Sequence, residues 1–122
     1  MKQETEKWIE QSEKDLKAAE SSLHSENYEW ASFQAHQATE KSLKALHIKK
    51  HKNFLKTHDL VLLSRKIDAP NNIVTLCSKI NPSYLDTRYP DVPKSYSRIE
   101  AEEIVSFAKE VIEWIKENLE MS

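Results

Sequence analysis

The chain has 122 residues, of which 31% are charged and 39% hydrophobic, a composition typical of one globular domain and not of a disordered segment. The formal net charge of −2 gives no overall nucleic-acid signature. Glycine is absent, which excludes the glycine-rich phosphate loop, the dinucleotide-binding fingerprint and the nucleophile elbow, because each needs glycine for close backbone approach or a positive φ.

Sequence features bearing on cellular location point in one direction. No apolar run approaches the roughly 18 residues of a membrane-spanning helix, and the charged N-terminal stretch lacks a signal-peptide pattern. The single cysteine, Cys77, has no partner for an internal disulfide and is expected to fill the core. These features predict a cytoplasmic protein with no membrane association.

Apolar residues at helical spacing predict two long helices, over about residues 4–24 and 28–50. The second carries a seam of small residues, and Trp30, Phe33 and Ile48 lie on its other sides. A helix that is apolar on several sides is central or packs against a second subunit, so these three residues are candidates for a dimer face. The seam consists of Ala31, Ala35, Ala38, Ser42 and Ala45.

Shorter elements are predicted in the second half of the chain. After a short loop, Thr57 suits the N-cap of a third helix that has His58 and Asp59 in its first turn. Pro70 suits the first turn of a fourth helix, which is expected to end at Asn81 because a proline follows.

An irregular segment and a last helix complete the prediction. Residues 81–98 contain three prolines and three tyrosines, and long ordered loops often carry function. The last helix begins at Ser97, where Glu100 completes a Ser-x-x-Glu capping box. The fold class predicted from these elements is all-α, formed by a single domain over residues 1–122.

Charge is unevenly distributed along the chain. Residues 41–66 carry eight Lys or Arg against one acidic residue, Asp59, whereas residues 99–122 carry seven Glu against two Lys. A basic segment of this kind attracts a phosphate-bearing partner, forms a solvated surface, or is neutralised by acidic helices across the bundle. All three interpretations stay open at this point.

A stripe of polar residues at helical spacing on the second helix is the first candidate for chemistry. The expected explanation is a solvated face with Glu40 and Lys44 paired at i, i+4. Lys44 argues against a metal ion on this stripe, because an ammonium repels a cation, and we predict no metal and no cofactor. The stripe consists of His36, Glu40, Lys44, His47 and His51.

The second candidate joins Lys41 and Lys44 to His58 and Asp59. If the third helix folds back beside the second, its N-terminus and the lysines form an anion site, where His58 can exchange protons. The alternative is that His58 and Asp59 only cap the helix and pair with neighbours.

The third candidate is a group of side chains in the irregular segment. An arginine there offers a fork for phosphate, and the tyrosines offer stacking surface for a base. Alternatively, the arginine pairs with a neighbouring carboxylate and the tyrosines pin the loop onto the bundle. The group consists of Tyr84, Asp86, Arg88, Tyr89 and Asp91.

The order of these pieces along nearly the whole chain resembles the HEPN domain. The resemblance implies an up-and-down bundle of four to five helices that forms a homodimer. It also implies a nucleotide- or RNA-related role, often beside a separately encoded minimal nucleotidyltransferase in a toxin–antitoxin pair. Nucleotide or phosphate contacts would then come from Lys41, Lys44, His58, Arg88 and Tyr89. The pieces are Trp8, Asp15-Leu16, Tyr28, Gln37-Ala38, Glu40-Lys41, Leu43-Lys44-Ala45, Thr57-His58-Asp59-Leu60 and Thr87-Arg88-Tyr89-Pro90-Asp91.

The chain departs from the ribonucleases of that family, which carry an Arg followed four to six residues later by a His. No His follows Arg65 at that spacing, and none follows Arg88 or Arg98 at all. We therefore expect a non-catalytic binding protein. One alternative is a ribonuclease toxin in which His58 acts as general acid or base and Arg88 stabilises phosphorane charge. The other is a module for dimerisation and partner docking alone.

Overall fold

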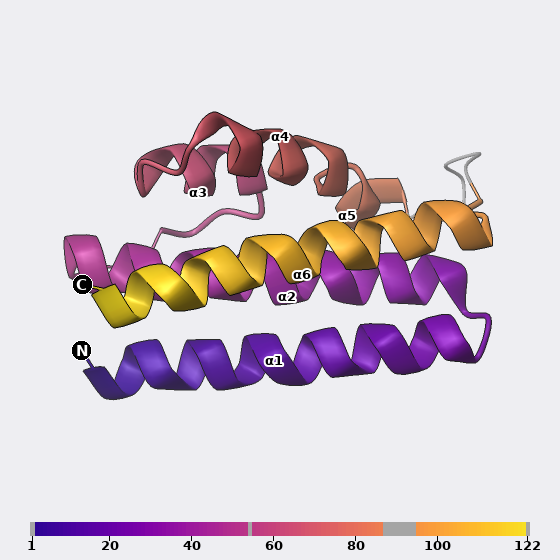
Figure 1. Ribbon diagram of the computed structural model, residues 1–122, viewed down its shortest axis with the longest axis horizontal. Helices are drawn as coiled ribbons and strands as arrows, with labels where there is room; N and C mark the ends of the chain where they lie inside the picture. The colour runs from indigo at the N-terminus through magenta and orange to yellow at the C-terminus, as the bar shows by residue number, and fades with distance from the viewer. Residues whose placement is uncertain (1, 54, 87–94, 122) are drawn as a thin grey trace.

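The computed structural model describes residues 2–53, 55–86 and 95–121. Three long helices, α1 (Lys2–His24), α2 (Tyr28–His51) and α6 (Arg98–Met121), lie side by side (Figure 1). α1 runs antiparallel to the other two, and the two ends of the chain lie at the same end of the bundle. Within the described ranges there is no strand, so the all-α helical bundle predicted from the sequence is confirmed.

A second layer of short helices covers one side of α2 and α6 (Figure 1). These short helices connect the end of α2 to the start of α6. These helices are α3 (Leu60–Lys66), α4 (Asn71–Ile80) and the single turn α5 (Ser83–Asp86). α5 lies in the segment predicted to be irregular, because four residues are too few to show a helical period. None of the described helices combines the length and the apolar character that a bilayer crossing needs.

α2 is the central helix, which is one of the two alternatives that its sequence predicted. The alanines of its seam are fully buried, and they let α1 approach closely enough for the Ser12 hydroxyl to donate to the Ala38 carbonyl oxygen at 2.6 Å. Ile48 is also buried, at 2% exposure, so its prediction as part of a dimer face is wrong. Trp30 is 54% exposed, because its position at the start of α2 lies outside the core.

Two helix N-termini test the predicted caps. Asp59, and not Thr57, caps α3, because its carboxylate accepts hydrogen bonds from two amides of the first turn, while Thr57 Oγ1 accepts from the Asp59 amide. His58 and Asp59 therefore precede α3. The capping box of α6 is confirmed, since Ser97 and Glu100 exchange reciprocal side-chain to backbone hydrogen bonds of 3.1 Å.

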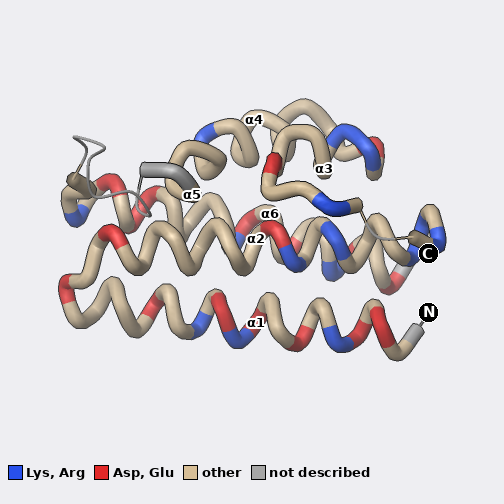
Figure 2. The backbone as a smooth tube through the Cα atoms, turned by 180° about the vertical axis from the view of Figure 1, so that it is seen from behind, with Lys and Arg blue, Asp and Glu red and all other residues tan. Residues whose placement is uncertain are grey.

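Part of the basic segment lies at the end of α2, where Figure 2 shows Lys and Arg positions in blue. Carbonyl groups in the last turn of a helix lack intrahelical partners and carry the negative end of the helix dipole, so cations there are stabilising. Lysines near the end of α2 donate to such groups at the ends of α3 and α6. The contacts are Lys50 Nζ to the Ile67 oxygen at 3.1 Å and Lys49 Nζ to the Leu119 oxygen at 2.5 Å.

Three residues have left-handed backbone conformations although none is glycine. They are Glu26 (φ 65°), Lys52 (φ 61°) and Asp68 (φ 57°). Each lies just after a helix, where a left-handed residue lets the chain turn away from the helix axis.

Candidate functional site

The polar stripe of α2 is mostly buried, which corrects the prediction of a solvated face. His36, Glu40, Lys44 and His47 are each at most 5% exposed, whereas His51 is exposed. The segment before α3 and the single turn α5 fold back over Glu40 and His36, and the Lys44 ammonium lies over the ring of Trp8 in α1. The predicted Glu40–Lys44 pair does form, inside the protein.

Glu40 is the centre of the cluster, and both of its carboxylate oxygens are bonded. Oε2 accepts a hydrogen bond from Lys44 Nζ at 2.8 Å, and Oε1 accepts one from His58 Nδ1 at 2.9 Å. His36 Nδ1 lies 3.8 Å from the same Oε1. A buried carboxylate needs such partners, because its desolvation is otherwise strongly unfavourable.

His58 is the exposed member of the cluster. Its side chain is 54% exposed, and its ring stacks on Tyr84 of α5, with the centroids 4.5 Å apart and the planes 20° from parallel. Because a carboxylate can only accept, Nδ1 carries the hydrogen in the bond to Glu40. Nε2, which is separated from Nδ1 by Cε1, makes no hydrogen bond with any residue of the described ranges.

His36 is a buried and neutral imidazole at pH 7. Burial lowers its pKa to about 4, outweighing the Glu40 carboxylate, which raises it; His58 lowers it further. Neither ring nitrogen has a hydrogen-bond partner of good geometry in the described part of the chain. The Asn81 side chain and the His58 backbone lie close enough to the ring to oppose the lowering of its pKa, although neither completes such a bond.

Asn81 and Asp59 fix the backbone on which His58 is carried. Asn81 Nδ2 donates to Asp59 Oδ1 at 2.9 Å, and Asn81 Oδ1 accepts from the Leu60 amide at 2.9 Å. The hydrogen bond from Asn81 is the main cause that holds the pKa of Asp59 below its usual value, and burial opposes it. The end of α4 is thereby tied to the start of α3, next to His58.

The structure brings together some of the five predicted contact residues. Lys44 and His58 meet through Glu40, but the Lys41 ammonium faces α1 and pairs with Asp15 at 2.6 Å. Arg88 and Tyr89 lie outside the described residues, as does Asp91.

Other residues of the site were recognised only in part from the sequence. The sequence allows Tyr84 to be either a stacking surface or a pin for the loop, and its ring contacts with α2 show that it pins α5 to the bundle. For Asn81 the sequence predicts only that α4 ends there. Its position, one residue before a proline, gave no signal for its role.

The two histidines at the end of α2, His47 and His51, each form a hydrogen bond with a backbone carbonyl group. His47 Nδ1 lies 3.0 Å from the Asn53 carbonyl oxygen, and His51 Nε2 lies 2.8 Å from that of Lys66. The described ranges hold no group of three or more metal-ligating side chains.

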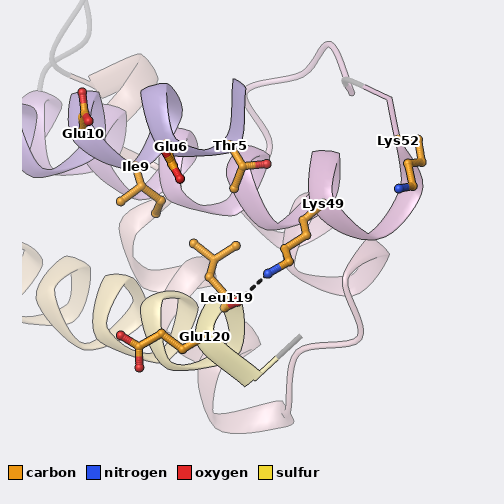
Figure 3. A pocket seen from close by; sticks show the side chains of 8 residues that line it. All are labelled: Thr5, Glu6, Ile9, Glu10, Lys49, Lys52, Leu119 and Glu120. Carbon is orange, nitrogen blue, oxygen red and sulfur yellow. Dashed lines mark hydrogen bonds between the residues drawn. The ribbon is translucent and has the colours of Figure 1, made fainter. Parts of the chain in front are cut away.

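A cavity of about 670 Å³ lies at the other end of the bundle from α5, between the start of α1 and the ends of α2 and α6 (Figure 3). Ile9 and Leu119 line it, and Lys49 reaches across to the end of α6. Its remaining lining consists of three glutamates, Lys52 and Thr5. It contains none of the residues predicted to contact a ligand.

Comparison with known proteins identifies relatives over nearly the whole chain. Residues 5–119 match the family model of the HEPN domain. TT1696 from Thermus thermophilus is 31% identical (TM-score 0.86), and the match covers 93% of this chain and 96% of that one. ST0689, an archaeal HEPN homologue, is 28% identical (TM-score 0.80) with 93% and 96% covered.

A third solved structure supports the fold alone. The HEPN domain protein tm0613 from Thermotoga maritima is 24% identical, with a TM-score of 0.74, and the match covers 93% of this chain and 97% of that one. The comparison with curated proteins found no significant match.

Proposed function

This chain belongs to the HEPN domain family, and from that premise we propose that it binds the phosphate of a nucleotide at His58 and is the non-catalytic partner of a minimal nucleotidyltransferase. The pair would act in the manner of a toxin and its antitoxin. The observation that supports the binding site is an exposed imidazole held in one orientation by a buried carboxylate.

The orientation of His58 suits anion binding. Glu40 occupies Nδ1, and the stack on Tyr84 covers one face of the ring, so the Nε2 edge is left to meet a ligand. When the imidazole is protonated, Nε2 becomes a donor and a charged hydrogen bond to a phosphate oxygen can form.

The charges around His58 agree with this role. Lys44 balances the carboxylate of Glu40, and His36 stays neutral at pH 7, so protonation of His58 leaves the cluster with one net positive charge. We infer that Lys44 acts on the ligand through Glu40, because Lys44 is only 4% exposed. Arg88 and Tyr89 remain proposed contacts on the evidence of the sequence.

Isothermal titration with ATP and GTP tests the binding site. We expect micromolar binding by the wild-type protein, and at least a tenfold loss on His58→Ala and on Arg88→Ala, because each removes a charged hydrogen bond of about 1.5–3 kcal/mol. His24→Ala is the matched control, since His24 is an exposed histidine at the end of α1. Equal binding by wild type and His58→Ala would contradict the site.

The proposed partners need a separate test. Light scattering of the purified protein gives its oligomeric state, for which we propose a homodimer. Co-expression with a nucleotidyltransferase encoded by the neighbouring gene, followed by size exclusion, tests the second partner. A neighbouring gene of another kind, or two separately eluting proteins, would contradict that pairing.

A ribonuclease is the second candidate, because an imidazole oriented by a carboxylate is also the arrangement of a general acid or base. In that case His58 would transfer the proton and Arg88 would stabilise the charge. Incubation with single-stranded RNA decides between the two: His58-dependent cleavage favours the ribonuclease, and intact RNA beside an active nuclease control removes it.

A further inference from the structure

Four aromatic rings form a continuous stacked row that runs from His58 to the start of α2. His58 stacks on Tyr84 at 4.5 Å, Tyr84 on Phe33 at 5.9 Å, and Phe33 on Trp30 at 5.3 Å. Neighbouring planes are within 23° of parallel. The row therefore joins the proposed phosphate site to a distant part of the surface.

The inner and outer rings of the row differ in exposure. Phe33 and Tyr84 are half-buried and fasten α5 to α2, which accounts for their contacts. The end rings are not needed for that, yet Trp30 and the His58 side chain are each 54% exposed. Trp30 is the largest exposed apolar side chain of the described residues.

The indole of Trp30 is also held in place. In the orientation that satisfies both ends of its amide, Gln34 accepts a hydrogen bond from Trp30 Nε1 at 3.0 Å and donates to Ser22 Oγ at 2.6 Å. An exposed ring that is already fixed loses little entropy when a planar ligand stacks on it.

We propose that this row is a stacking surface for single-stranded nucleic acid, with a base on Trp30 and a phosphate at His58. The inference rests on the proposed function and names its ligand class. The row has three ring-to-ring steps, and each step, at 4.5 to 5.9 Å, is longer than the ~3.4 Å rise between neighbouring stacked bases. A ligand that reaches both ends of the row therefore holds several nucleotides. Aromatic platforms bind such strands with little sequence preference.

The test compares an oligoadenylate octamer with ATP, at one fixed salt concentration, for the wild-type protein and Trp30→Ala. We expect the octamer to bind more tightly than ATP, and Trp30→Ala to weaken octamer binding by about 5- to 150-fold while leaving ATP binding unchanged. Trp30→Phe keeps a ring and should retain most of the octamer affinity. Ile99→Ala, at a 71% exposed apolar residue of α6, should bind like wild type.

Different binding results would contradict the stacking inference and the proposed function. If ATP binding depends on His58 but the octamer binds Trp30→Ala and wild type equally, the stacking inference is wrong and the proposed function stands. If wild type binds neither ATP nor the octamer, both are wrong. If Trp30→Ala leaves octamer binding intact and dissociates a dimer in light scattering, the indole serves self-association and the stacking inference is again wrong.

Discussion

The two long faces of α2 are both buried, but by different means. The alanine seam packs against its neighbours through small apolar side chains, whereas the face under α3 and α5 buries Glu40, Lys44 and His36. The seam is close-packed and gains from dispersion and the hydrophobic effect. The polar face is stable only while each charge keeps its partner. The alanine seam therefore holds the fold, whereas the polar face carries the candidate site.

Glu40→Ala should have the largest effect on stability. It removes the carboxylate to which both Lys44 and His58 are bonded, and loss of one partner of a buried ion pair costs about 3–5 kcal/mol. Urea unfolding at pH 7 measures this loss. The double variant Glu40→Leu with Lys44→Met should recover much of it, since no buried charge is left. A single variant as stable as wild type would show that the polar face does not depend on the pair.

The polar face should also make stability depend on pH. The pKa of His36 is about 4 in the folded protein, whereas its ordinary value is 6.5. At a pH between these two values, the unfolded chain binds a proton that the folded chain does not bind. Stability should therefore fall as pH decreases from 6.5 to 4, by up to about 3 kcal/mol. Urea unfolding at several pH values measures the slope, which His36→Phe should flatten. An unchanged slope in that variant would assign the effect to other groups.

On the opposite face, Ala35→Leu should destabilise by about 1–3 kcal/mol, because a fully buried alanine in a close helix contact has no room for a larger side chain. Thermal unfolding followed by circular dichroism checks the loss. Unlike Glu40→Ala, this variant should leave the pH dependence unchanged. A neutral result would mean that the seam is not close-packed.

The smallest effect on stability is expected at an exposed pair of Lys and Glu, the same residue types as the buried pair of Glu40 and Lys44. Lys109 and Glu20 lie 3.1 Å apart and are each about half exposed. Glu20→Ala should change stability by about 1 kcal/mol or less, because water and salt screen the pair. A loss as large as that of Glu40→Ala would show that burial is not what distinguishes the two pairs.

Much of the fold follows from local patterns. Helical spacing of apolar residues located the long helices to within a few residues, and the Ser97 capping box marked the start of α6. The third helix was predicted to begin two residues too early, because the pattern favours Thr57 over Asp59 as its cap. Both residue types suit that position, and the choice depends on the contact of Asp59 with Asn81, which is distant in sequence.

The site was harder to predict, because its key property is burial by a distant segment. The i, i+4 spacing of His36, Glu40 and Lys44 marked one face, but charged faces are usually solvated. Only the return of His58 and Tyr84 over α2 turns that face into a cluster, and no local pattern encodes this contact. The spacing itself was the available signal.

The absence of glycine has a consequence for how far this protein can be improved. Glu26 and Lys52 adopt left-handed conformations that cost a residue with a side chain about 1–2 kcal/mol, and glycine would adopt them freely. Glycine also raises the entropy of the unfolded chain, which offsets about half of the gain. Glu26→Gly and Lys52→Gly should each still raise the free energy of unfolding by roughly 0.5–1 kcal/mol. The chain could therefore be stabilised at the ends of α1 and α2 without any change to its core.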